Sequence, residues 1–175
     1  AVTITGNIGG GGALTSLDIN ATGASTGTGN INILGNIGAD GTSGSGVVAL
    51  GNSNNGTITF GTSGTESEYF TTGAQTYDAA TYSLVGTDPD FNASSENISF
   101  LDGASGITLA TGSDLTVDTA HDQDGNITIE GEIGSTSGQT TTVTIEAGSG
   151  TVSVAAMATG IGNVTLDGSG GVTLN

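Results

Sequence analysis

A short phrase of alternating apolar and polar residues returns along the chain, and this recurrence constrains the fold more than any other feature. The phrase reads NITIEGEIG at residues 126–134, with close copies at residues 30–38 and 2–9. Alternation with a period of two predicts a strand that buries one face and exposes the other. Its return at intervals indicates a repeat protein built from short strands and glycine-rich turns.

The spacing of these phrases predicts how the strands are arranged. The first apolar residues of the copies and shorter echoes are Val2, Ile31, Ile58, Ile98, Ile127 and Val164. The commonest step between them suits a coil of three short strands and three turns. We therefore predict an all-β chain folded as a parallel β-helix, or β-solenoid, of about six coils. An antiparallel β-sandwich is the alternative, because its strands also recur at short, regular intervals.

An asparagine opens four of these strands, at Asn30, Asn97, Asn126 and Asn163. Stacked coils place equivalent residues above one another, and stacked asparagines hydrogen-bond along the stack. We therefore expect an asparagine ladder.

One region departs from the pattern. The step from Ile58 to Ile98 is the longest of the series, and residues 66–92 carry five of the seven aromatic residues and the only proline, Pro89. We expect residues 1–175 to form a single solenoid segment, with a loop that protrudes near residues 86–96. The strand pattern runs to both ends of the sequence, so we expect the segment to belong to a longer chain or to a polymer.

The charge of the chain excludes several classes of partner. It contains 17 acidic residues, no lysine and no arginine, for a net charge of −17. Nucleic acid, anionic lipid and heparin-like polymers are excluded as partners because binding phosphate or sulfate groups requires basic side chains. We expect no membrane insertion either, since no run of about 18 apolar residues occurs.

Residues 71–80 (TTGAQTYDAA), followed by Tyr82-Ser83-Leu84, resemble a phrase of the filamentous-haemagglutinin-like adhesins, which are giant repetitive bacterial surface proteins. The turn-strand phrases at residues 131–134 (GEIG) and 145–148 (IEAG) are similar to their repeats. This resemblance implies a right-handed parallel β-helix that is exported to the cell surface and acts as a stalk, adhesin or filament.

No residue pattern predicts catalysis. His121, the only histidine, lies among aspartates without the serine and oxyanion hole of a hydrolytic triad. An inverting glycoside hydrolase works with two carboxylates, and Asp88, Asp90 and Glu96 are the one cluster that would need testing for it. We expect no enzymatic activity.

Asp118, Asp122, Asp124 and Asn126 are candidate calcium ligands, because side-chain oxygens recur at alternate positions from Asp122 to Asn126, as a hard cation requires, and Asp118 lies shortly before them. The stretch does not match an EF-hand, since Ile127 and Ile133 replace its glycine and glutamate. The alternative is an Asx-rich turn before a strand.

Two further sets of residues are candidates for contact with carbohydrate. Aromatic faces stack on sugar rings, which makes Tyr69, Tyr77, Tyr82 and Phe91 candidate ligand-binding residues. The alternative is that these rings fill a wider coil. Three sequons with loop-like surroundings are candidate glycosylation sites: Asn20, Asn55 and Asn92.

These observations together predict a non-enzymatic structural segment of an extracellular bacterial filament, stalk or adhesin. Its partner would be itself, as a homopolymer or as neighbouring repeats of one chain, because open solenoid ends expose unpaired strand edges. The alternative is an adhesin module that binds a glycan or a cell surface through residues 69–91.

Overall fold

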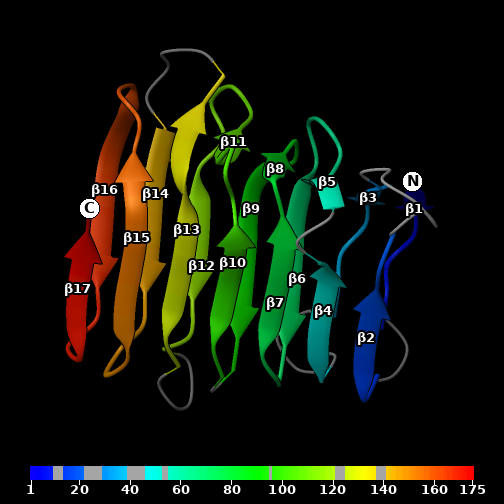
Figure 1. Ribbon diagram of the computed structural model, residues 1–175, viewed down its shortest axis with the longest axis horizontal. Coiled ribbons are helices and arrows are strands. Elements are labelled where there is room, and N and C mark those ends of the chain that lie inside the picture. Colours follow the sequence, from blue (N-terminus) through cyan, green and yellow to red (C-terminus); the bar gives the residue numbers. More distant parts are fainter. Residues whose placement is uncertain are drawn as a thin grey trace.

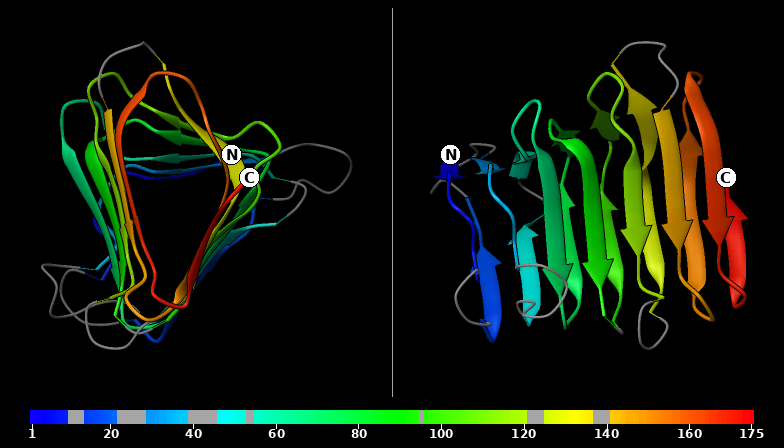
Figure 2. Two further views of the ribbon diagram at one scale, coloured as in Figure 1. Left: turned by 90° about the vertical axis from the view of Figure 1, so that its left-hand side faces the viewer. Right: turned by 180° about the vertical axis from the view of Figure 1, so that it is seen from behind.

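The computed structural model describes residues 1–9, 14–21, 29–38, 46–52, 55–94, 96–120, 125–136 and 141–175. Every strand pairing in this part is parallel, and consecutive strands lie on different faces of a coil, so the β-solenoid prediction is confirmed and the sandwich is excluded. The strands lie side by side along the long axis (Figure 1) and enclose a triangular outline when seen along it (Figure 2). No helix occurs among the described residues, and hence none there is long and apolar enough to cross a membrane.

The solenoid has three faces. The first face carries β2 (Ser16–Ile19), β4 (Val47–Gly51), β7 (Gln75–Ala79), β10 (Ile98–Asp102), the start of β13 (Ile127–Ser135), the start of β15 (Thr151–Met157) and β17 (Gly171–Leu174). The second face carries β1 (Val2–Ile4), β3 (Gly29–Ile33), β5 (Asn55–Phe60), β8 (Thr81–Leu84), β11 (Ile107–Leu109) and the ends of β13 and β15.

The third face is the five-stranded sheet of β6 (Glu66–Thr71), β9 (Thr87–Ala93), β12 (Leu115–Asp118), β14 (Thr141–Glu146) and β16 (Ile161–Asp167). Single bridges from Ile8 to Ile37 and from Ile37 to Tyr69 continue it toward the N-terminal end. Five coils therefore have a strand on all three faces, and incomplete coils extend both ends.

The register explains the irregular spacing of the repeated phrase. Ile58 pairs with Tyr82 in the next coil of the second face, whereas Ile98 lies on the first face. The long step from Ile58 to Ile98 is therefore one coil plus the passage across the third face. The prediction of a protruding loop at residues 86–96 is wrong, because β9 occupies residues 87–93 and pairs with strands on both sides.

Inward side chains form one continuous apolar core. It includes Ile31 on the second face, Val48 on the first and Ile145 on the third, and each of these side chains is fully buried. Inward residues of neighbouring coils stack directly, as Ile98 stacks on Ile127. Coils approach closely at the corners. At Gly51, where φ is 84°, an added Cβ would lie 2.3 Å from the backbone oxygen of Asp78, so glycine is required there.

Outside the core, polar side chains join neighbouring coils at the corners. The Oδ1 atom of Asn97 accepts a hydrogen bond from the backbone N–H of Asn126 at 2.7 Å, and Oδ1 of Asn126 accepts from the N–H of Thr151 at 2.9 Å. The predicted asparagine ladder is thus confirmed at this corner. Asn30 and Asn163 lie within β3 and β16 on the other two faces, and Oδ1 of Asn30 accepts the N–H of Thr57 from the next coil at 3.2 Å.

Candidate functional site

The aromatic residues proposed to bind a ligand lie inside the solenoid. The side chains of Tyr69, Tyr77, Tyr82 and Phe91 are 0% exposed. The ring of Phe91 stacks on that of Tyr69 with centroids 4.6 Å apart, and its edge meets the ring of Phe60 at 5.1 Å. A sugar in solvent cannot reach these faces. The alternative interpretation, that the rings fill the interior of the coil, is the one that the structure supports.

A buried glutamine organises the polar atoms among these rings. The Nε2 group of Gln75 donates to the backbone oxygens of Tyr69 and Asn92 at 2.8 and 2.7 Å, and to the hydroxyl of Thr71 at 3.0 Å. Its Oε1 atom accepts from the hydroxyl of Tyr77 at 2.9 Å. Burial raises the pKa of the Tyr77 hydroxyl, which therefore stays protonated and remains a donor. Gln75 thus satisfies the polar groups where the third face turns into the first.

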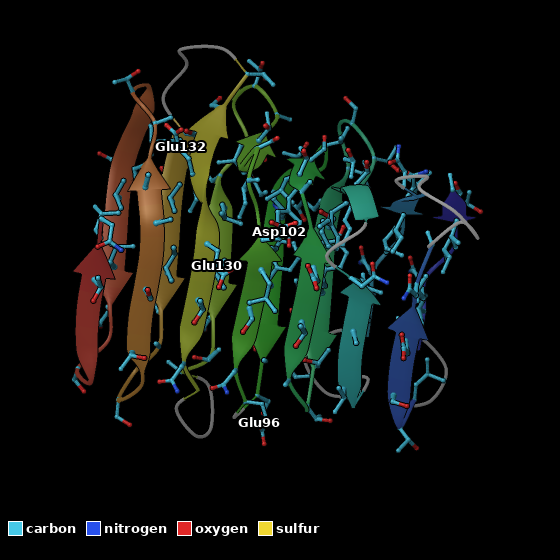
Figure 3. The ribbon with its side chains drawn as sticks, in the orientation of Figure 1. Glu96, Asp102, Glu130 and Glu132 are labelled. Carbon is cyan, nitrogen blue, oxygen red and sulfur yellow. The ribbon has the colours of Figure 1, made fainter. Side chains whose placement is uncertain are left out.

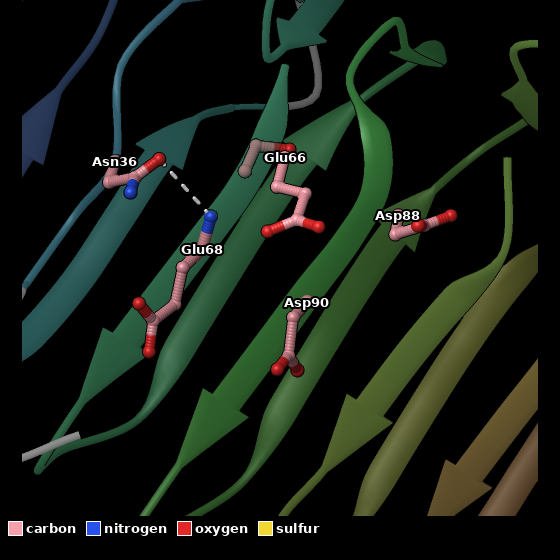
Figure 4. A pocket seen from close by; sticks show the side chains of 6 residues that line it. Asn36, Glu66, Glu68, Asp88 and Asp90 are labelled. Carbon is pink, nitrogen blue, oxygen red and sulfur yellow. Dashed lines mark hydrogen bonds between the residues drawn. The ribbon is translucent and has the colours of Figure 1, made fainter. Parts of the chain in front are cut away.

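A concavity on the third face is lined mainly by acidic residues. Its volume is about 240 Å³, and its lining consists of Asn36, Glu66, Ser67, Glu68, Asp88 and Asp90. Figure 4 shows the carboxylates of β6 and β9 on neighbouring strands, with Oδ1 of Asn36 accepting the N–H of Glu68 at 3.2 Å. Strand pairing places Glu68 directly beside Asp90.

A second row of carboxylates lies on the same face toward the C-terminal end. Asp118 pairs with Glu146, and Glu146 pairs with Asp167. We call the outward side chains of Glu68, Asp90, Asp118, Glu146 and Asp167 the acidic face. No lysine or arginine exists in the chain to neutralise it.

Asp90 has the most perturbed carboxyl group of the acidic face. Its pKa is raised to about 6, chiefly by burial, and further by the negative charges of Glu68 and Asp118. One of its oxygens, Oδ1, is buried and has no hydrogen-bond partner.

Asp88, in the same strand, has a different role. Its φ is 48°, in the left-handed region that aspartate tolerates better than most residues. Its backbone N–H donates to Oγ of Ser113 at 3.1 Å, and its Oδ1 atom accepts from the N–H of Asp114 at 3.0 Å. In turn Oδ1 of Asp114 accepts the N–H of Thr142 at 2.6 Å. Asp88 therefore joins coils, as the asparagine ladder does.

The hydrolase candidates are not brought together as a set. Asp88 and Asp90 line the concavity, whereas Glu96 is exposed beyond the end of β9, beside the start of β10 (Figure 3). An inverting hydrolase requires an acid and a base on opposite sides of one sugar ring. Asp90 holds a proton more tightly than an ordinary aspartate, but the carboxylates around it come from neighbouring strands of one sheet. The three hydrolase candidates therefore do not form one opposed acid–base pair in the described part of the chain.

The calcium candidates are only partly described. Asp122 and Asp124 lie outside the described residues, as does His121. Oδ1 of Asp118 accepts the N–H of Ala120 at 2.6 Å, and Oδ1 of Asn126 accepts both the N–H and the hydroxyl of Thr151. Both side chains therefore already have structural partners. Within the described part of the chain, no group of three or more His, Asp or Glu side chains is placed to hold a metal ion.

The sequons differ in their surroundings. Asn20 is exposed directly after β2, as expected of a loop. Asn55 begins β5. Asn92 lies within β9 and its Oδ1 atom is buried, so the expectation of a loop is wrong there.

Sequence alternation contained a signal that would have placed the rings inside. Thr76 and Asp78 flank Tyr77, and Asp90 and Asn92 flank Phe91, so each ring occupies the inward position of its strand. Comparison of the chain with protein-family models, curated proteins and solved structures gives no match.

Proposed function

We propose that this chain is a structural, non-enzymatic repeat segment of an extracellular filament, stalk or adhesin. The observation that carries the proposal is the continuous core, in which inward side chains stack from Ile31 to Val154 through every complete coil. A rod of this kind transmits force along its axis, because each coil is joined to the next by strand hydrogen bonds and by corner ladders.

The composition supports an extracellular setting. Trypsin-like proteases cleave after lysine and arginine, and the chain has neither. Frayed corners therefore offer such proteases no site. The resemblance of residues 71–80 to surface adhesins agrees with this setting.

Binding of glycan through residues 69–91 is not favoured, because the rings are fully buried. Adhesion by this chain would use its outer polar surface or another part of a longer protein. We therefore propose that this segment contacts other β-solenoid coils, either in further copies of this chain or in neighbouring repeats of a longer chain.

The experiment combines a shape measurement with an activity test. Small-angle X-ray scattering of the purified chain should fit the profile of the solenoid in Figure 2, and incubation with a panel of neutral and acidic polysaccharides should release no sugar. Release of sugar that Asp90→Asn abolishes, and the control Asp167→Asn preserves, would overturn the proposal in favour of a hydrolase.

A further inference from the structure

A second concavity lies at the corner where the second face turns into the third. The turn from β8 to β9 contains only Val85 and Gly86, whereas the turns from β5 to β6 and from β11 to β12 run over residues 61–65 and 110–114. The short turn therefore lies between two turns that extend further outward (Figure 1). The resulting hollow has a volume of about 400 Å³, which is within the range of small-molecule sites. We call it the corner groove.

The corner groove is lined by hydroxyl groups and by apolar side chains. Ser83 and Thr108 occupy outward positions of two strands that pair directly, so the two residues lie one strand spacing, about 4.8 Å, apart. Both are half-buried, and Ser63 adds an exposed hydroxyl from the turn after β5. Val85 and Ala110 supply apolar surface between these hydroxyls. The groove therefore combines apolar contact with groups that hydrogen-bond.

The charge around the corner groove narrows the class of ligand. No charged residue is among the described residues that line it. The second face beside it is uncharged from β1 to β11, because β1, β3, β5, β8 and β11 contain no aspartate or glutamate. A cation is drawn instead to the acidic face, and an anion is repelled by a chain of net charge −17. The groove therefore suits an uncharged ligand that forms hydrogen bonds.

We infer that the corner groove binds a short segment of neutral glycan. A sugar unit carries several hydroxyl groups, which exchange hydrogen bonds with Ser83 and Thr108 because each of these side chains both donates and accepts. The C–H groups of the sugar contact Val85 and Ala110. The site lies on the opposite side of β8 from the buried ring of Tyr82, so it does not use the aromatic core. This inference goes beyond the proposed structural function, which does not require it.

A peptide suits the corner groove less well than a glycan does. Extended peptides commonly bind by adding a strand to an open edge of a sheet. The strand beside the groove, β8, pairs with β5 on one side and with β11 on the other, so it offers no open edge. A glycan needs no such edge, because its hydroxyl groups bind side chains. The structure therefore favours carbohydrate over peptide at this place.

An NMR titration of the isotope-labelled chain tests this inference. The probes are oligosaccharides of glucose, of mannose and of galactose, with oligogalacturonate as the acidic comparison. At least one neutral probe should shift the amide signals of the corner groove in a saturable way, and oligogalacturonate should shift none of them. Ser83→Ala and Thr108→Val should each raise the dissociation constant about fivefold, the change expected when one hydrogen bond is lost. The matched control Thr116→Val, at an outward position of the third face, should leave it unchanged.

Several results would overturn the inference. These are the absence of shifts with every neutral probe at millimolar concentration, shifts that map away from the corner groove, and a dissociation constant that neither Ser83→Ala nor Thr108→Val changes. Stronger binding of oligogalacturonate or of an uncharged peptide in the groove would overturn it as well. The mapping uses the unaltered chain, so it does not depend on how well the variants fold. None of these results would alter the scattering profile of the solenoid, so failure of this inference is distinguishable from failure of the structural function.

Discussion

The side chain of Asn97 holds the backbone of Asn126 one coil further along the rod, through a hydrogen bond of 2.7 Å from the N–H of Asn126 to Oδ1 of Asn97. Asn126 repeats the arrangement by accepting the N–H and the hydroxyl of Thr151. This corner therefore forms a relay in which each residue positions the next, and it supplies hydrogen bonds that the strands leave unmade.

Removing one member of this relay should weaken the fold. We expect Asn126→Ala to lower the free energy of unfolding by about 1–2 kcal/mol, because two donors of Thr151 lose their acceptor. Urea denaturation measures the change. Asn163→Ala, in the same sequence phrase but exposed on the edge strand β16, should cost less than about 0.5 kcal/mol. Equal effects would show that the relay does not stabilise the coil.

Substitution of Gln75 should lower the free energy of unfolding far more than removal of the Tyr77 hydroxyl. Gln75→Leu removes the hydrogen bonds to the backbone oxygens of Tyr69 and Asn92 and to the hydroxyl of Thr71, and leaves the buried hydroxyl of Tyr77 without its acceptor. We expect a loss of about 3 kcal/mol or more, since each orphaned buried group costs about 1–3 kcal/mol. Tyr77→Phe removes a single hydrogen bond and should cost about 1 kcal/mol. Calorimetry of the two variants measures which one is less stable. A larger loss of stability in Tyr77→Phe than in Gln75→Leu would contradict this network.

Truncation of Phe91 should unfold the central coils and should not act through ligand binding. Its ring contacts those of Phe60, Tyr69, Tyr77 and Phe100. Phe91→Ala should cost about 3–5 kcal/mol, because it removes these contacts and leaves a cavity. Val47→Ala, at a position that is 47% exposed, is the control and should change stability by less than about 0.5 kcal/mol. A stable Phe91→Ala rod with lost glycan binding would restore the ligand-binding interpretation.

Asp90 should make the protein more stable in mild acid. Its pKa is about 6 in the folded state against 3.8 as the ordinary value, so the folded state binds the proton more tightly. The cost of ionising it is absent below about pH 4 and fully present above about pH 6, so stability falls as pH rises through this window.

Asp90→Asn removes that cost and should flatten the profile. After allowance for solvent screening at this half-buried site, we expect a gain of about 1–2 kcal/mol at pH 8 and little change at pH 4. Chemical denaturation across this pH range measures it. The control Asp167→Asn removes one exposed charge and shows how much of any change is a general effect of net charge.

Calcium should stabilise the rod, because carboxylates of neighbouring strands stack without any cation in the chain. A calcium concentration about ten times the dissociation constant adds about 1.4 kcal/mol, or a few degrees in melting temperature. Thermal melts with calcium, with chelator and with sodium chloride of equal ionic strength separate binding from screening. An equal response to sodium would show that no calcium is bound.

The sequence by itself determined the type of fold. Alternation in residues 126–129 predicts a half-buried strand, and the echo of this phrase at residues 97–100 predicts that like strands stack on one another, as Ile98 and Ile127 do. The ladder from Asn97 to Asn126 follows from the same argument, because each of these asparagines directly precedes a copy of the same strand phrase.

Which strands share a face was decided only by the tertiary structure. Alternation with a period of two is identical on all three faces, so nothing local in the phrase distinguishes them. The coil also varies in length, because the step from Ile37 to Tyr69 on the third face is longer than the step from Val152 to Val172 on the first. The turns lie outside the core, so their lengths can vary from coil to coil. Copies of the same phrase therefore lie on different faces.

The acidic face and the buried polar network depend on that same non-local register. The whole of β7 and β8 separates Glu68 from Asp90 along the chain, and only the pairing of β6 with β9 makes them neighbours. Burial chiefly raises the pKa of Asp90, and the charge of Glu68 raises it further. Gln75 is a polar residue at an inward position of β7. The alternation shows that this position is unusual for a polar residue, but it does not predict which groups Gln75 binds. Alternation is a property of one strand, whereas charge crowding and hydrogen bonding between coils are properties of the stack.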